Sequence, residues 1–319
     1  MHDLTDSFSR INRGYDATFQ VGRLSLGLVV PITAYPNNPV PDMTGHLARV
    51  QRVEALGFRA VWLRDVPFVV PSFGDAGQLH DPFTYLGYLA GQISKIALGV
   101  ASIVLPLRHP AHVAKTAASV DQLSGGRLIL GVASGDRLEE YPAMAADHGQ
   151  RGEAFQAAFD YIRAMASSAP RINNRYGCVG GDIEMLPKPH SARLPLLITG
   201  SSRQSPDWIA RHGDGWMIYP RPGHAQECML RDWRSRLVSL GEPPKPVLQP
   251  LYIDLSENPD EEPLPIHLGF RAGHRWLTTY LKRLEEMGVH HVALNLRFNR
   301  AHIDDTLERL ARDVLPHFD

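Results

Sequence analysis

Short apolar runs alternate with segments of helical period along most of the chain. The runs have the length and branching of buried strands, which predicts eight of them, at residues 24–30, 60–63, 96–105, 128–133, 195–199, 216–219, 247–253 and 292–296. The segments between them place apolar residues on one helical face, as Val113, Ala117 and Val120 do after Pro110. Eight strands alternating with helices predict an α/β fold, a TIM (β/α)8 barrel.

An open, doubly wound sheet is the competing architecture. Such a sheet usually carries a glycine-rich dinucleotide-binding turn after its first strand. The corresponding residues here are Val30-Pro31-Ile32-Thr33, which include no glycine. The pattern therefore favours the closed barrel, whose functional site lies at the C-terminal ends of the strands.

The chain divides into an N-terminal extension, residues 1–22, and a single barrel domain, residues 23–319. The extension is mixed and polar, and we expect it to wrap the outside of the fold or to be partly disordered. Residues 68–81, 136–149 and 254–270 are long insertions, which we expect at the C-terminal face as a lid. Residues 168–194 are polar and contain several prolines, which predicts an irregular segment.

Composition excludes several classes of function. The chain has 33 basic and 34 acidic residues, so its charge gives no reason to expect nucleic acid or an anionic membrane as a partner. Its two cysteines lie far apart and no zinc-binding motif occurs, so we expect no metal. The motif of a serine hydrolase does not occur either. The start lacks the apolar core of a signal peptide, and no run is long enough to span a membrane. We therefore expect a soluble cytoplasmic protein.

The segment from Lys95 to Asp136 carries the most specific pattern. It reads KIALGVASIVLPLRHPAHVAKTAASVDQLSGGRLILGVASGD, with a strand, a helix and a second strand that ends in small residues. The order and spacing of its motifs resemble the bacterial luciferase-like monooxygenase family, and weaker matches extend the resemblance to residues 23–300. The family's members are TIM barrels that depend on flavin or deazaflavin, which raises our expectation of a barrel with a cofactor at its mouth.

A polar turn after the fifth strand is the strongest candidate for binding a phosphate. Gly200, Ser201, Ser202 and Arg203 follow the strand, and Ser205 precedes a predicted helix. Free backbone N–H groups, hydroxyls and a guanidinium are the donors that a phosphate requires. The resemblance places the flavin phosphate at this loop. The structural alternative is that Ser205 only caps the helix.

Two strand ends are further candidates for holding the cofactor. Ser134 matches an arginine that holds the phosphate in luciferases, so the positive charge here would come from Arg203 or Arg137. Ala101 and Ser102 match a place where several family members have a non-prolyl cis peptide behind the flavin ring. We expect a bulge under the ring at this point, and the alternative is simply two small residues in a tight barrel.

The candidates for catalysis are Arg64, Asp65 and His109. Arg64 and Asp65 end the second strand, and the luciferases' catalytic histidine falls on Val66, so its role cannot be transferred. Asp65 could act as a general base or hold a ring N–H, and its structural alternative is an ion pair with Arg64 or another arginine. His109 matches a luciferase histidine, and its alternative is a surface or capping role.

The resemblance implies a flavin-dependent monooxygenase that uses reduced FMN and oxygen on an unknown small organic substrate. A separate flavin reductase would supply the reduced cofactor, because no nicotinamide-binding fingerprint is present, and relatives are commonly homodimers. Two alternatives remain open: a deazaflavin-dependent oxidoreductase that transfers a hydride, and a protein that binds flavin without catalysis.

Overall fold

Eight parallel strands form a closed barrel in the computed structural model, which describes residues 7–318. The barrel strands are β1 (Ser25–Val29), β2 (Ala60–Leu63), β3 (Ala97–Val104), β4 (Leu128–Ala133), β7 (Leu196–Thr199), β8 (Gly215–Met217), β9 (Val247–Leu255) and β12 (His291–Asn295). They pair in this order, and the contacts of β8 with β9 and of β12 with β1 close the ring. The predicted TIM barrel is confirmed.

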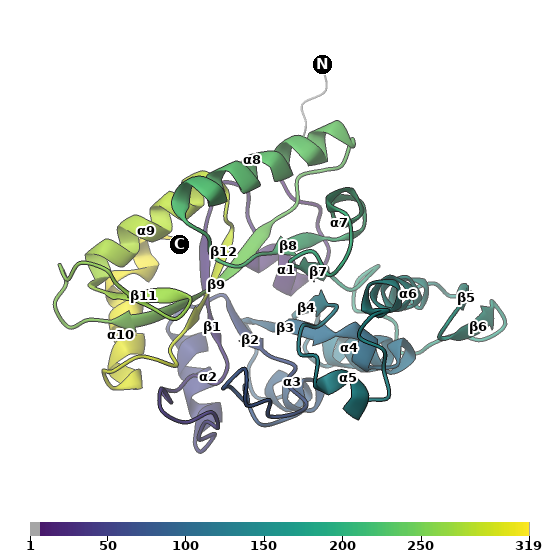
Figure 1. Ribbon diagram of the computed structural model, residues 1–319, viewed down its shortest axis with the longest axis horizontal. Coiled ribbons are helices and arrows are strands. Elements are labelled where there is room, and N and C mark those ends of the chain that lie inside the picture. Colours follow the sequence, from purple (N-terminus) through teal and green to yellow (C-terminus); the bar gives the residue numbers. More distant parts are fainter. Residues whose placement is uncertain (1–6, 319) are drawn as a thin grey trace.

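Each barrel strand is followed by a helix on the outside of the ring (Figure 1). These helices are α2 (His46–Ala55), α3 (Pro82–Ala90), α4 (Pro110–Leu123), α6 (Arg151–Ala164), α7 (Pro206–His212), α8 (Gly223–Ser239), α9 (His274–Met287) and α10 (Ile303–Asp313). Short 3₁₀ turns occupy Leu105–Leu107 and Leu315–His317. Proline at the first position of α3, α4 and α7 suits a helix start, where its missing N–H is not needed.

The strands are buried on both faces, which explains their continuous apolar runs. In β2, Val61 and Leu63 pack in the core beneath the helices, whereas Trp62 between them fills the barrel interior. Gly99 on the neighbouring β3 leaves room for that indole, because a Cβ there would lie 2.2 Å from the Trp62 ring. The alternation of large and small side chains therefore fills the barrel.

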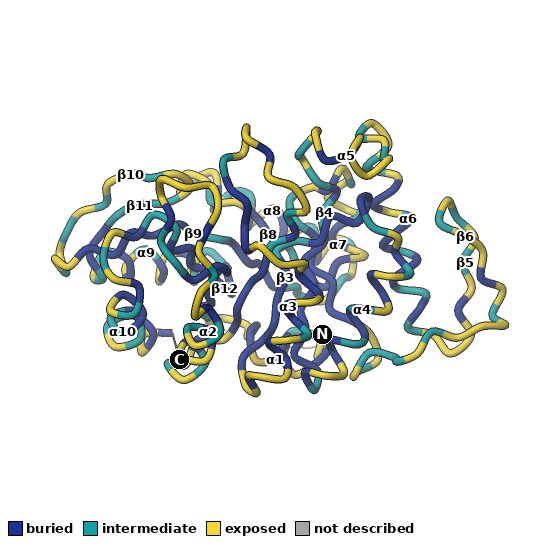
Figure 2. Tube along the Cα trace, turned by 90° about the horizontal axis from the view of Figure 1, so that it is seen from below, coloured by how far each residue is buried: buried dark blue, intermediate teal, exposed yellow. Residues whose placement is uncertain are grey.

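The described part of the N-terminal extension, residues 7–22, does not wrap the outside of the fold, and residues 1–6 lie outside the described residues. Helix α1 (Arg13–Thr18) lies at the N-terminal end of the barrel, where Tyr15 and Phe19 join the interior cluster. The Tyr15 hydroxyl donates to the carbonyl of Asp214 just before β8, and the Gly14 N–H donates to the carbonyl of Gly126 before β4. Helix α1 thus lies at the bottom of the barrel, opposite α5 (Glu140–Ala143) and β10 (Leu264–Ile266) (Figure 2).

Two hairpins lie outside the barrel. The first, β5 (Arg171–Asn174) with β6 (Gly177–Gly180), falls in residues 168–194, so the prediction of an irregular segment there was wrong. Figure 1 shows it projecting beyond α6. Its strands are four residues long and mostly polar, which hides the strand period. The second, β10 (Leu264–Ile266) with β11 (Gly269–Ala272), extends the C-terminal half of β9.

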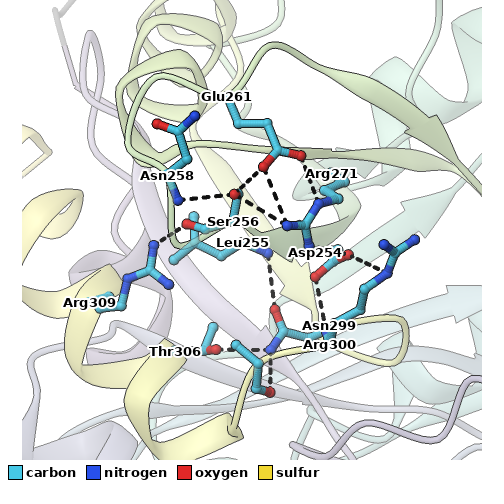
Figure 3. A network of polar contacts seen from close by, with 11 residues as sticks. Asp254, Leu255, Ser256, Asn258, Glu261, Arg271, Asn299, Arg300, Thr306 and Arg309 are labelled. Atoms are coloured by element: carbon cyan, nitrogen blue, oxygen red, sulfur yellow. Dashed lines mark hydrogen bonds and ion pairs between the residues drawn. The ribbon is translucent and has the colours of Figure 1, made fainter.

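A network of charged and polar groups fixes the second hairpin (Figure 3). Asp254, which is 1% exposed, receives Arg271 of β11 at 2.9 Å and Arg300 at 3.2 Å. Arg271 also pairs with Glu261 at 2.7 Å. The amide of Asn299 contacts both the Leu255 N–H and the Thr306 hydroxyl, which ties β9 to α10. We call these groups the Asp254 network.

Within residues 7–318, every helix is too short or too polar to cross a membrane. The same residues bring together no group of three His, Cys, Asp or Glu side chains that could hold a metal ion.

Candidate active site

The predicted bulge in β3 is confirmed. The register of β3 against β4 shifts between Val100 and Ile103, and Ala101 and Ser102 are joined by a cis peptide bond. Both residues are only partly buried, unlike the rest of the strand. The Ser102 hydroxyl is hydrogen-bonded to that of Thr199, the last residue of β7. The bulge therefore adjoins the loop that follows β7.

That loop, residues 200–205, has an unusual backbone. Ser202 and Arg203 are both left-handed, with φ of 43° and 62°, which is uncommon outside glycine. The N–H groups of Ser201 and Ser202 donate no hydrogen bond within the described chain, and successive N–H groups in such a turn can surround an anion. The Arg203 side chain is exposed and has no ion pair among the described residues.

Two of the predicted serines are engaged in the loop itself. The Ser202 hydroxyl is buried and donates to the carbonyl of Thr199 at 2.7 Å. Ser205 caps α7, because its hydroxyl accepts the N–H of Trp208 at 3.2 Å, as the structural alternative predicted. Ser202 and Ser205 thus shape the turn, which leaves the amides of Ser201 and Ser202 and the guanidinium of Arg203 as free donors.

Ser134 lies at the end of β4, one strand from the bulge. It is buried, and its carbonyl accepts the hydroxyl of Tyr141 from α5. Its own hydroxyl has no partner in the described part of the chain, so it can donate to a ligand at the mouth of the barrel.

Arg64 forms one side of the mouth together with Arg297. The guanidinium of Arg64 donates to both oxygens of Asp75, at 2.8 and 3.0 Å, and to the Tyr35 hydroxyl at 3.1 Å. Arg297 pairs with the same carboxylate at 2.9 Å and lies over the Tyr35 ring. Burial alone would lower the pKa of Arg64, but the hydrogen bonds that it donates to Asp75 raise it, so this guanidinium stays charged.

Arg137 lies after β4, and its nearest carboxylate is Glu140. The two groups are 3.6 Å apart, too far for a hydrogen bond, and the facing atoms of both are buried without a partner in the described residues. The guanidinium lies over the Phe73 ring, 4.8 Å from its centre. Burial raises the pKa of Glu140 to about 7, although Arg137 opposes the shift.

Asp65 is fully occupied by other groups. Arg108 donates two hydrogen bonds to its carboxylate, at 2.7 and 3.0 Å, and the Val104 N–H donates a third. The side chain is 2% exposed. The geometry therefore favours the structural alternative, an ion pair with an arginine at the rim, although the partner is Arg108 and not Arg64. A general base needs a carboxylate that is free to accept a proton, and this one is not.

His109 does not join the other predicted residues. It caps α4, and its ring contacts the carbonyl of Tyr176 in the β5–β6 hairpin at 3.2 Å. Its ring also lies near those of Tyr161 and His112. The structure thus places His109 in its capping alternative, between the outer helices and a hairpin.

The rim of the mouth is apolar. Among residues 7–318, ten of the sixteen large hydrophobic side chains that are exposed lie in the segments between a barrel strand and the helix after it: Val40, Phe68, Val69, Phe73, Leu79, Leu138, Met144, Tyr219, Leu264 and Leu268. Exposed apolar groups concentrated in one region mark a binding surface. The long insertions predicted at this face carry eight of these ten side chains.

Sequence reasoning missed Asp75, Arg297 and Tyr35 as parts of the mouth. Arg297 stands two residues after the last barrel strand, so the rule that named Arg64 also applied to it. Asp75 and Tyr35 lie well inside loops, where no periodicity indicates which side chain turns inward.

Comparison with known proteins now identifies the family. Residues 24–262 match the luciferase-like monooxygenase family. The chain belongs to this family. The predicted resemblance is confirmed, and family members are monooxygenases or other oxidoreductases, so the protein is an enzyme of this type.

The relatives of this luciferase-like protein include a monooxygenase and a dehydrogenase that is named for its dependence on F420. It is 26% identical over 170 residues to the alkanal monooxygenase alpha chain of Photorhabdus luminescens, covering 52% of this chain and 45% of that one. It is 28% identical over 179 residues to an F420-dependent hydroxymycolic acid dehydrogenase of Mycobacterium tuberculosis, covering 55% and 49%. The matched parts span about half the length of these relatives.

Solved structures agree on the fold. A monooxygenase from Streptomyces bottropensis superposes with a TM-score of 0.78 at 17% identity, covering 92% of this chain and all of that one. The luciferase-like family binds flavin or the deazaflavin F420.

Proposed function

We propose that this enzyme is a flavin-dependent monooxygenase that uses reduced FMN and oxygen on a small organic substrate. The observation that carries the proposal is the pair of features at the ends of β3 and β7. The 200–205 loop offers unpaired backbone N–H groups, and the bulge at Ala101–Ser102 adjoins it through the contact of Ser102 with Thr199. A phosphate and a flat ring, joined as they are in FMN, suit these neighbouring features.

Each residue has a defined part in the proposal. The amides of Ser201 and Ser202 and the guanidinium of Arg203 would hold the phosphate. Ala101 and Ser102 would support the ring, and the Ser134 hydroxyl would donate to it from β4. When bound, reduced flavin supplies the electrons with which oxygen oxidises the substrate. The apolar rim would exclude water from that reaction.

A second candidate is a deazaflavin-dependent oxidoreductase. It is favoured by the similarity to the mycobacterial relative whose name states that it depends on F420. The same loop would hold the phosphate of that coenzyme, so residue geometry does not separate the two candidates. Titration of the purified protein with FMN and with F420 does, because we expect the physiological cofactor to bind at least tenfold more tightly.

The phosphate site is tested with Arg203→Ala. We expect its affinity for FMN, followed by quenching of flavin fluorescence, to fall at least tenfold, or about 1.4 kcal/mol. The control is Arg211→Ala, which removes the same charge from the exposed far end of α7. Equal affinities of the two variants would mean that the phosphate binds elsewhere.

Catalysis is tested by oxygen uptake. Addition of the protein and an aldehyde to chemically reduced FMN should consume oxygen faster than free reduced FMN alone, with oxidised product formed. Binding of FMN without any product from a panel of small substrates would support the non-catalytic alternative. We expect a separate reductase to supply reduced FMN in the cell, and homodimerisation stays a prediction that sedimentation measurements can check.

A further inference from the structure

Three arginines come together at the mouth of the barrel and are not used by the proposed cofactor site. Arg64 follows β2, Arg137 follows β4 and Arg297 follows β12, and their side chains are only 17%, 14% and 11% exposed. We call them the mouth arginines. Arginine is rarely buried to this extent unless its donors are matched by acceptors.

Their donors are not all matched. Six buried side-chain atoms have no hydrogen-bond partner within the described chain, and three of them belong to the mouth arginines: Nε of Arg64, Nη1 of Arg137 and Nε of Arg297. A fourth is the carboxylate oxygen of Glu140 that faces Arg137. Because nearly all buried polar atoms in proteins are paired, this concentration indicates missing acceptors at one place.

The carboxylates nearby do not supply those acceptors. Asp75 is shared by Arg64 and Arg297 and also accepts the N–H of Gly77. Glu140 lies too far from Arg137 for a hydrogen bond, and Asp136 on the same loop is exposed to solvent. The arginines therefore keep N–H groups for a ligand.

The charges of all three guanidinium groups influence the pKa of one phenol, that of Tyr252. Burial raises the pKa of Tyr252, and the charges of Arg64, Arg297 and Arg137 oppose that rise. The contacts agree, because Arg64 and Arg297 share Asp75, and Arg137 lies over the ring of Phe73, two residues before Asp75 in the same loop.

This position is distinct from the proposed phosphate loop. In the ring order β1-β2-β3-β4-β7-β8-β9-β12, Arg64 and Arg297 follow the two strands that flank β1. The 200–205 loop follows β7, four strands from β1 in either direction and hence across the barrel. Arg64 and Arg297 thus lie across the mouth from that loop, and Arg137, which follows β4 next to β7, lies between the two positions.

The geometry points to a substrate that is an organic anion, with a carboxylate held by the mouth arginines and an apolar body against the rim. The inference rests on the proposed function, because it names the substrate class of that same site. Arginine suits a carboxylate, since its planar fork can donate two parallel hydrogen bonds. Phe73, which stacks on Arg137, and Tyr219 would contact the apolar part.

The test compares matched probes by calorimetry, with the protein alone and with the protein saturated with FMN. Octanoate is compared with octanol, and phenylacetate with 2-phenylethanol, so that each pair differs only in the anionic group. We expect at least one carboxylate to bind tenfold or more tightly than its alcohol. The double variant Arg137→Gln with Glu140→Gln, which removes one charge of each sign, should lose that preference and keep its affinity for FMN.

Two further variants guard the interpretation. Arg312→Gln, on the exposed surface of α10, is the matched control and should keep the preference. Arg137→Lys keeps the positive charge but not the planar guanidinium, so it should lose part of the preference for carboxylates. Circular dichroism checks that each variant is folded.

Three outcomes would overturn the inference. The first is that neither carboxylate binds more tightly than its alcohol. The second is that the double variant binds carboxylates with the affinity of the native protein. The third is that octanoate displaces FMN, which would assign the arginines to the cofactor's own phosphate. Failure of the proposed function is recognised separately, because the protein would then bind no flavin while the comparison of carboxylate and alcohol without cofactor still gives its answer.

Discussion

Two groups of arginines and carboxylates lie on the C-terminal side of this barrel, and they differ in how completely they are paired. In the Asp254 network, Arg271 and Arg300 face Asp254 and Glu261, and every buried side-chain polar atom among these four residues has a partner. At the mouth, Arg64 and Arg297 share one carboxylate, Arg137 stands 3.6 Å from Glu140, and several buried donors are left unpaired. A complete network holds a hairpin in place, whereas an incomplete one is suited to a ligand.

The largest effect is expected in the complete network. Arg271→Gln removes the partner that joins Asp254 to Glu261 and leaves Asp254 with Arg300 alone. Because a buried carboxylate loses much of its compensation, the free energy of unfolding should fall by about 2–3 kcal/mol. Urea denaturation measures it, and a loss below about 0.5 kcal/mol would show that the network is dispensable.

A smaller effect should depend on pH and arise at Glu140. Burial raises the pKa of this carboxyl to about 7, against the charge of Arg137 and with the help of Asp65, Asp136 and Glu139. The folded state therefore binds the proton more tightly than the unfolded state does. The stability that this proton contributes is fully present below the unfolded pKa and is lost as pH rises through about 7.

Glu140→Gln keeps the shape of the side chain and removes its charge. The native protein should therefore lose stability relative to the variant between about pH 4.5 and 7, by about 1 kcal/mol or more at pH 8. Thermal unfolding of both proteins across this range gives the difference, and parallel curves would contradict the prediction.

The smallest effect on stability is expected for Arg137→Gln, the same substitution as in the first prediction but at the incomplete group. Among the described residues its one ion-pair partner is Glu140, 3.6 Å away, and one of its N–H groups is already unpaired. We expect the free energy of unfolding to change by less than about 1 kcal/mol. A loss as large as that of Arg271→Gln would remove the distinction between the two groups.

The barrel could be predicted from the sequence because its strands are buried on both faces. Each strand is then a continuous apolar run, and the helix after it has its own period. The β5–β6 hairpin escaped detection because Arg171–Asn174 is polar and only four residues long. Helix α1 escaped because Tyr15 and Phe19 are isolated aromatic residues in a polar segment.

The site could be predicted only where a residue stands directly after a strand. Ala101, Ser102, Ser134 and the 200–205 loop are strand ends, and the structure brings them to the mouth. The pairing of Asp65 with Arg108 could not be foreseen, because the path of the β3–α4 connection decides it. His109 lies one residue beyond Arg108 and yet faces the outer hairpin.

Helix α1, at the bottom of the barrel, has a consequence for how ligands enter and leave the enzyme. Tyr15 and Phe19 pack below the strands and cover the N-terminal end of the barrel. In the proposed function, cofactor, substrate and product would all use the C-terminal mouth, so whichever binds first would obstruct the next. We expect such an enzyme to bind its ligands in a fixed order, with the release of one molecule limiting the rate at which the next can bind.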